Sequence, residues 1–420
     1  MKGPSLLKLL KMKKILLIFS CYVTLFVPFF FVSCSEEDNA PLDIDNQVEQ
    51  DNSTEDQINA DNSTTDSTDT SGSDPAIAEE FSRALMLTNW ADNIIIPSFE
   101  KFVSDLDSLV ISGNRFTTDP NQVSLTKLRE SWLNAYLSWQ SVDMFDIGKA
   151  EEITLRNYIN VFPLDASGMT ESLLSGNYDL SSVNRQDEQG FSALDYLLFG
   201  LSGDDDKIID FYTEEVQGDL YKKFLTDLIE RMQYLSSLVL QDWKNDFRDE
   251  FIERDGSSAT ESVNSMVNDY IYYYEKFLRA GKIGIPAGVF SGSPLSDRVE
   301  AKYSGVFSKE LFSAALNSSQ DFFNGVHFDK SDTGVSLQSW IIHLAETEDT
   351  NNLSGEINEN FDLVRIQLNN LSDNFRIQVE SDNLSMLQTY DMIQENVVLM
   401  KVDMLQLFDI KVDYIDADGD

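Results

Sequence analysis

Cysteine and histidine, which often act as nucleophile, general base or transition-metal ligand, are scarce in this sequence of 420 residues. Its two cysteines, Cys21 and Cys34, both lie near the N-terminus, and its only histidines are His327 and His343. The chain beyond Cys34 therefore has no disulfide, no thiol nucleophile and no cysteine-held metal. The presence of only two histidines also disfavours a histidine-rich zinc site and Ser-His catalysis.

Carboxylates, in contrast, dominate the charge of the chain. The 72 Asp and Glu residues outnumber the 31 Lys and Arg residues, which gives a formal net charge of −41 at pH 7. A field of this sign repels phosphate backbones, so we expect no nucleic-acid partner. It attracts cations, and carboxylate oxygens are good ligands for hard metal ions. The alternative is that the acidic surface only keeps an exported protein soluble.

Residues 1–33 have the layout of a signal peptide. Three lysines between positions 11 and 14 precede an apolar run over residues 15–32, as in the basic and apolar regions of secretory signals. A run of this length could also cross a membrane as a helix. The segment from Phe31 to Cys34 instead resembles the lipobox of bacterial lipoproteins, with Phe where Leu is usual. It predicts cleavage before Cys34 and lipidation of that cysteine.

Residues 34–78 are predicted to form a disordered, acidic tether. Positions 35–78 contain no Lys or Arg and few large apolar side chains, so this segment cannot bury enough apolar area to offset the entropy of ordering. Residues 35–38, Ser-Glu-Glu-Asp, resemble the surface-export signal of Bacteroidetes lipoproteins. We therefore expect an outer-membrane lipoprotein that contacts the membrane through its lipid and faces the periplasm or the cell surface.

Apolar residues recur at helical spacing from residue 81 onward. One such stripe steps by three or four residues through positions 95, 99, 102, 106 and 109, and another through positions 125, 128, 132, 135, 139 and 142. A third covers residues 386–407. Each stripe predicts an amphipathic helix, and the absence of strand-like alternation before residue 410 predicts an all-α protein of helical bundles.

The helical part is predicted to divide into two bundles packed side by side. The sequence Arg-Asp-Gly-Ser-Ser at positions 254–258 is typical of a turn between elements. It separates an N-terminal helical bundle over residues 79–253 from a C-terminal helical bundle over residues 254–420. Each bundle has a length that is common for a single domain.

Several of these segments together resemble the imelysin-like family of exported bacterial proteins. They are a proline-containing first helix at residues 93–99, a second helix at residues 132–145, an Asn-x-x-Pro-Leu-Asp loop at residues 160–165, the signature helix at residues 190–200, and the Lys-Ile-Gly-Ile-Pro-Ala-Gly segment at residues 282–288. Members of this family have been filed as peptidases and later linked to iron uptake. The resemblance covers nearly the whole exported part.

The chain departs from the family at the signature itself. The family motif is Gly-x-His-x-x-Glu, proposed to hold a metal through the His and the Glu. Here Gly190 is followed by Ser192 and Asp195 at those two positions. A hydroxyl is a poor ligand for a transition metal, but Asp195 could join Asp143 and Asp165 in an all-oxygen pocket for a hard cation. Alternatively, Ser192 and Asp195 only satisfy polar groups of the fold.

These observations favour a binding protein over an enzyme. The first hypothesis is a lipid-anchored protein that captures iron, another metal ion or a small ligand for uptake at the cell envelope, with Asp143, Asp165, Gly190, Ser192 and Asp195 as the candidate ligand-binding residues and Asp195 as the candidate metal ligand. The resemblance also implies an exported metallopeptidase, although the missing histidine counts against catalysis. The remaining alternative is a surface protein with an inert relict site.

Overall fold

Long helices, several of them containing π-helical turns, make up the computed structural model, which describes residues 81–345 and 352–414. In these ranges no strand forms, and the only β-type pairing is one isolated bridge between Val326 and Thr333. The prediction of an all-α protein is confirmed.

The N-terminal half contains α2 (Arg83–Asn89), α3 (Ile96–Thr118), α4 (Gln122–Trp139), α5 (Lys149–Glu152), α6 (Leu155–Ile159), α7 (Ala166–Ser175), α8 (Gly190–Asp195), α9 (Asp205–Thr213), α10 (Gly218–Asp242) and α11 (Arg248–Glu253). The C-terminal half contains α12 (Ser262–Tyr272), α13 (Ile285–Ala287), α14 (Ser308–Asn324), α15 (Leu337–Ala345), α16 (Leu353–Leu368), α17 (Phe375–Ser381), α18 (Asn383–Val398) and α19 (Leu405–Phe408). Short 3₁₀ helices are η2 (Val183–Glu188) and η6 (Ser296–Arg298).

Five π-helical segments lie inside or at the end of longer helices. They are η1 (Trp90–Ile95), η3 (Tyr196–Gly200), η4 (Trp243–Phe247), η5 (Tyr273–Gly284) and η7 (Leu399–Met404). The first of them joins α2 to α3 directly before Pro97, whose missing N–H and ring disturb the regular helical ladder. Such widened turns are rare and often occur at functional sites.

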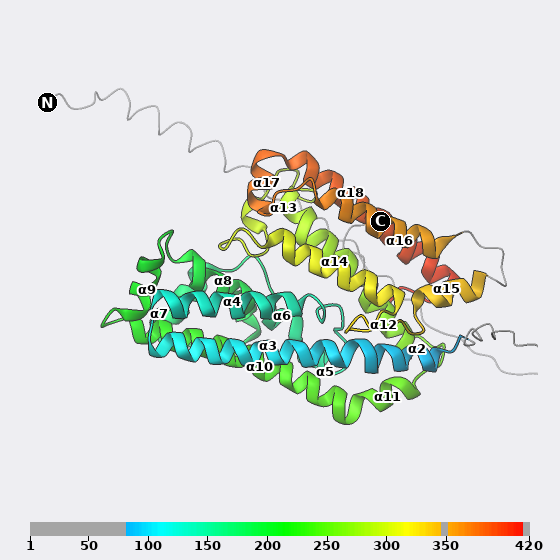
Figure 1. Cartoon of the computed structure of the whole chain (residues 1–420), viewed down its shortest axis with the longest axis horizontal. Helices are drawn as coiled ribbons and strands as arrows, with labels where there is room; N and C mark the ends of the chain where they lie inside the picture. The colour runs from blue at the N-terminus through cyan, green and yellow to red at the C-terminus, as the bar shows by residue number, and fades with distance from the viewer. Residues whose placement is uncertain (1–80, 346–351, 415–420) are drawn as a thin grey trace, which may run out of the picture. The chain divides into compact units, whose positions relative to one another are not determined.

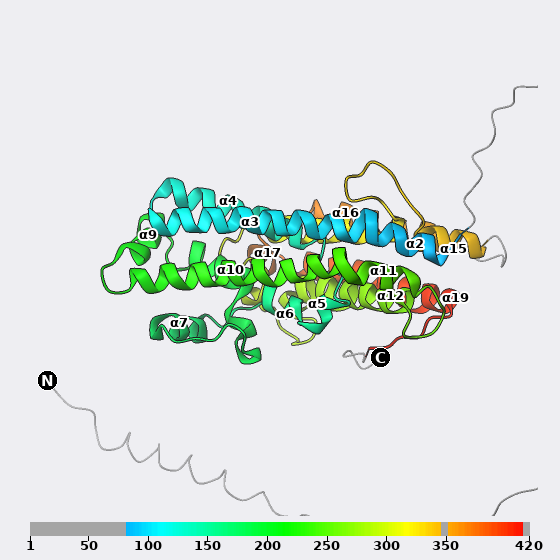
Figure 2. The same cartoon turned by 90° about the horizontal axis from the view of Figure 1, so that it is seen from below.

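Helix α3 is the centre of the N-terminal half and packs against both α4 and α10 (Figure 1, Figure 2). Its apolar stripe, including Phe99, Phe102 and Leu106, is completely buried. Helix α4 runs antiparallel to α3. The connection between them is short, and the hydroxyl oxygens of Ser112 and Ser131 lie 2.7 Å apart. The helical periodicity of the sequence therefore identifies the core faces of these helices correctly.

The C-terminal half packs around η5 and α18. Helix α18 contacts both η5 and α16, and α14 packs on α15 and α16. Figure 1 shows these helices, coloured yellow to red, lying alongside the blue and green helices of the N-terminal half.

The two halves share buried contacts. Helix α14 packs on α4, and Phe322 of α14 has its ring centroid 5.0 Å from that of Trp90 and 5.4 Å from that of Phe145. Residues 76–420 accordingly group into one compact unit. The division into bundles at residues 79–253 and 254–420 stays a prediction.

The leader and the tether lie outside the described residues, so the predicted signal peptide, Cys34 and the disordered segment are not described. Within residues 81–345 and 352–414, no helix combines the length and the apolar character needed to cross a membrane.

Candidate functional site

The signature helix α8 begins at a glycine that no other residue can replace easily. Gly190 has a φ of +75°, and a Cβ atom there would lie 2.2 Å from the backbone oxygen of Ile159. The start of α8 therefore lies directly against the end of α6. Gln189, just before the helix, donates hydrogen bonds to the carbonyl oxygens of Leu180 and Arg185. These contacts fix the position from which the next turn projects its side chains.

Ser192 stands where the family has histidine, and it ties α8 to the neighbouring loop. Its hydroxyl donates a hydrogen bond of 2.6 Å to the backbone oxygen of Val161. The side chain is nearly buried, with 8% of its surface exposed. The hydroxyl of Ser192 thus donates its hydrogen bond within the protein, to the loop that carries the Asn-x-x-Pro-Leu-Asp sequence.

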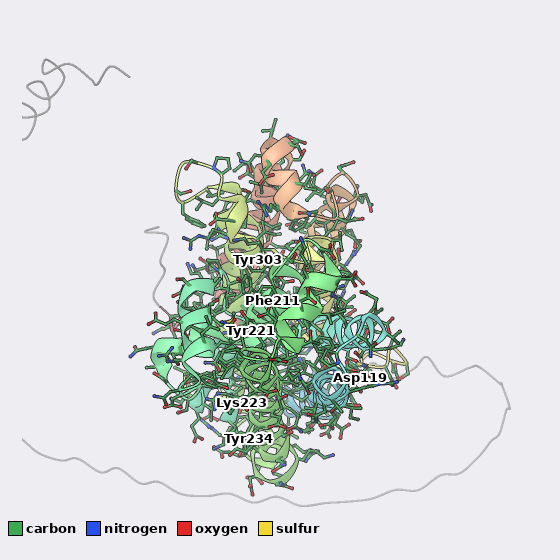
Figure 3. All side chains as sticks on the ribbon, turned by 90° about the vertical axis from the view of Figure 1, so that its left-hand side faces the viewer. Asp119, Phe211, Tyr221, Lys223, Tyr234 and Tyr303 are labelled. Carbon is green, nitrogen blue, oxygen red and sulfur yellow. The ribbon has the colours of Figure 1, made fainter. Side chains whose placement is uncertain are left out.

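Asp195 stands where the family has glutamate, and it binds the C-terminal half of the chain. Its Oδ2 accepts a hydrogen bond of 2.7 Å from the backbone N–H of Tyr303, and its Oδ1 accepts one of 2.9 Å from that of Ser304. Burial raises the pKa of Asp195 to about 6, although these backbone hydrogen bonds lower it in part. Figure 3 labels Tyr303 on the face of the helical body that it shows. We call this pair of hydrogen bonds the Asp195 clasp.

The other two predicted carboxylates have separate roles. Asp143 is buried and pairs with Arg156, whose Nε lies 2.9 Å from the carboxylate. Asp165 is exposed and caps α7, accepting hydrogen bonds from the backbone N–H groups of Ser167 and Gly168 at 3.1 and 3.0 Å. In the described ranges, no three His, Cys, Asp or Glu side chains converge in a way that could hold a metal ion. Asp143, Asp165 and Asp195 therefore do not form the all-oxygen pocket expected from the sequence.

The motif implies a metal, and the residues at the motif positions do not fit one. Asp195 already accepts two backbone hydrogen bonds, and Ser192 offers a hydroxyl whose proton points to a carbonyl oxygen. Each side chain thus forms hydrogen bonds with a different segment of the backbone. The arrangement matches the alternative in which both residues satisfy polar groups of the fold.

A buried polar network close to α8 was not foreseen from the sequence. Lys282 of η5 donates hydrogen bonds to Glu300 at 2.5 Å and to the side-chain oxygen of Gln140 at 2.9 Å. Asn160 donates to the other oxygen of Glu300 at 2.9 Å and accepts from the Tyr136 hydroxyl at 2.7 Å. These five side chains are almost completely buried. Only the apolar neighbours of Lys282 in the sequence could have indicated a buried lysine.

A second buried cluster surrounds Arg156. Besides Asp143, this guanidinium contacts Asp146 at 3.2 Å and Asp269 at 3.6 Å, and it lies over the ring of Phe277. Burial raises the pKa of Asp269 to about 7, against the opposing effect of Arg156. The single positive charge of Arg156 is thus shared by three acidic side chains. Protonation of Asp269 near neutral pH reduces the excess negative charge of this cluster.

A cleft of about 410 Å³ lies elsewhere, between α3, α4 and α14. One face of each helix lines it, and the small residues Ser98, Ser138 and Ser318 leave the space open. Its volume lies in the range of small-molecule sites. The cleft could not be predicted from the sequence, because its shape depends on how helices from the two halves pack together.

The cleft is lined by both apolar and charged side chains. Phe328, one of its lining residues, donates its backbone N–H to the carbonyl oxygen of Asn93 at 2.8 Å, which joins the loop after α14 to η1. The lining also includes the Lys330–Asp321 ion pair. Along α3, Lys101 pairs with Asp105 at 2.5 Å. The lysine of each pair is more exposed than its aspartate.

Comparison with known proteins places the fold in a recognised group. The family model for imelysin matches residues 95–396. No curated protein matches the sequence significantly.

Two solved structures have the same fold. One belongs to a protein assigned as an iron-regulated protein A precursor from Parabacteroides distasonis, with a TM-score of 0.64 and 16% sequence identity over 80% of this chain and 97% of that chain. The other is an imelysin-like protein from Psychrobacter arcticum, with a TM-score of 0.60 and 15% identity over 80% of this chain and 100% of that one.

Proposed function

Because the chain belongs to the imelysin family, we propose that it is a lipid-anchored, non-catalytic protein of the cell envelope that binds an iron-related ligand. The P. distasonis neighbour is named as an iron-regulated protein. That name and the shared fold support the proposal that the ligand contains iron. The lipobox-like segment ending at Cys34 supports the anchor.

One observation carries the non-catalytic part of the proposal, namely the Asp195 clasp. A metallopeptidase needs a metal held by several side chains and an open position for water. Here the signature carboxylate accepts hydrogen bonds from Tyr303 and Ser304, and the histidine is replaced by Ser192. The motif positions contribute to the stability of the protein and leave no base and no metal ligand for hydrolysis.

The cleft between α3, α4 and α14 is the ligand site of this proposal. A bare ion would require converging ligands, and the described residues provide no such group. A cleft of about 410 Å³ fits a compact organic molecule. Lys101 and Lys330 can contact anionic groups of the ligand, while apolar lining residues such as Leu137 and Phe328 accommodate its uncharged part. The ligand is therefore an organic complex of iron with carboxylate or similar anionic groups.

Calorimetric titration of residues 35–420 with ferric citrate, and with citrate alone, tests this proposal. Ser138 lines the cleft, so Ser138→Tyr fills it. Ser108→Tyr, on the exposed side of α3, is the matched control, because both serine hydroxyls donate to a carbonyl of their own helix. We expect binding by the parent and by Ser108→Tyr, and loss of binding in Ser138→Tyr. Equal binding by all three proteins would refute the cleft as the site.

Two further measurements test the remaining parts of the proposal. Labelling of cells with a palmitate analogue should modify the parent and leave Cys34→Ser unmodified. Casein should stay intact during incubation with the purified protein, with or without a chelator. Cleavage that the chelator abolishes would establish the peptidase alternative.

A further inference from the structure

A second groove lies on the C-terminal half, between α16 and α18. It has a volume of about 450 Å³ and is lined by Glu356, Glu359, Asn360 and Leu363 of α16 and by Glu395, Val398 and Leu399 of α18 and η7. The two helices run antiparallel here, since Asn360 contacts Glu395 and the side chain of Asn396 donates to the carbonyl oxygen of Ile357. Figure 1 shows both helices at the outer side of this half.

Exposed apolar side chains continue along this groove. Leu363 and Val398, within it, expose 40% and 46% of their surfaces. Ile366 and Val402 follow one turn further along their own helices, in opposite directions because the helices are antiparallel, with 61% and 53% exposed. Single exposed apolar residues are ordinary, but two within a groove and two more on the same pair of helices are typical of a surface that a partner covers.

The charges around the groove define the partner. Three of its lining residues are glutamates, and none is Lys or Arg. This excludes an anionic lipid surface and disfavours a second copy of a chain with a net charge of −41. A basic segment that also carries apolar side chains complements both the glutamates and the exposed Leu and Val.

From these features we propose that the groove docks an amphipathic helix of a partner protein, with leucine-like residues on the buried face and Lys or Arg along its edges. The apolar residues of such a helix, spaced by three and four, enter the groove between α16 and α18. Its basic side chains pair with Glu356, Glu359 and Glu395. This surface lies on other helices than the α3–α4–α14 cleft, so the inference does not depend on the proposed ligand.

Fluorescence polarisation with a labelled synthetic peptide tests the proposal on residues 35–420. The peptide is helical, with leucines on one face and lysines on the other. Two groove variants, Glu359→Lys and Leu363→Ser, are each matched by a control on a different helix. Glu310→Lys makes the same charge change at an exposed position of α14, and Ile111→Ser removes an apolar residue of α3 that is 69% exposed.

We expect the parent and both controls to bind the peptide alike, and each groove variant to bind about tenfold more weakly. Binding should also weaken as salt is added, because exposed charges contribute to it. Absence of binding by the parent would overturn the proposal. So would equal losses in groove and control variants, or equal binding of a peptide in which glutamates replace the lysines.

Discussion

The carboxylate of Asp195 and the backbone N–H of Tyr303 are joined by a hydrogen bond of 2.7 Å across a sequence separation of 108 residues. With the second bond to Ser304, it holds the signature helix against the turn that precedes α14. Asp195 is almost completely buried, so water cannot replace these bonds. The residue at the signature position thus connects the two halves of the protein.

Removal of this carboxylate should destabilise the protein. Asp195→Ala leaves two backbone N–H groups without an acceptor, and we expect a loss of about 2–4 kcal/mol in the free energy of unfolding. Asp165→Ala, which removes an exposed helix cap, should cost only about 1 kcal/mol. Urea denaturation of the two variants and the parent measures the difference. If Asp195→Ala costs no more than Asp165→Ala, the clasp has no structural importance.

The pH dependence of stability should reveal the buried acid Asp269. Its pKa in the folded protein, about 7, is raised from the ordinary value of 3.8. For an acid with a raised pKa, the contribution to stability is fully present below the unfolded pKa and is lost as pH rises through the folded one. We expect the free energy of unfolding to fall between about pH 4 and pH 7 in the parent.

Asp269→Asn provides the comparison, because an amide oxygen can still accept the hydrogen bond from the backbone N–H of Asp146. The fall in stability between pH 4 and pH 7 should be smaller in this variant than in the parent. Urea unfolding at a series of pH values gives both curves. Identical slopes would show that Asp269 does not titrate in this range.

The buried ion pair of Lys282 and Glu300 should behave differently from a surface pair. Lys282→Met leaves Glu300 buried without its cation, which should cost about 3–5 kcal/mol of stability. Lys127→Met removes a pair with Glu130 in which both side chains are more than half exposed, and the expected change is below about 1 kcal/mol. Adding Glu300→Leu to Lys282→Met should restore part of the loss. Thermal and urea unfolding test all three variants, and similar losses for both single variants would contradict this account.

The helices could be predicted from the sequence because the helical spacing of apolar residues is a local pattern. Phe99, Phe102 and Leu106 repeat at helical spacing and become one buried stripe of α3. The π-helical turns gave no comparable signal. The twelve residues Tyr273–Gly284 carry no sequence pattern that distinguishes a π-helix from an α-helix, and in the structure they pack against α18.

The candidate site was only partly predictable. The sequence indicated that Ser192 and Asp195 lie on one short helix, which they do. It could not indicate that Asp195 would bind Tyr303 and Ser304, since long-range pairing follows from the packing of distant segments. For the same reason, Asp143 could not be assigned to Arg156 in advance. The role of Asp165 at the start of α7 is a local one, because Asp is a common N-cap residue.

The central claim is that the signature carboxylate is structural, and a zinc titration tests it most directly. Calorimetry on the parent and on Asp195→Asn, in the same buffer, compares a protein with the carboxylate to one without it. We predict that zinc binding is weak and equal in the two proteins, because Asp195 is occupied by Tyr303 and Ser304. Tight zinc binding by the parent that disappears in Asp195→Asn would contradict the claim and return the signature helix to a metal site.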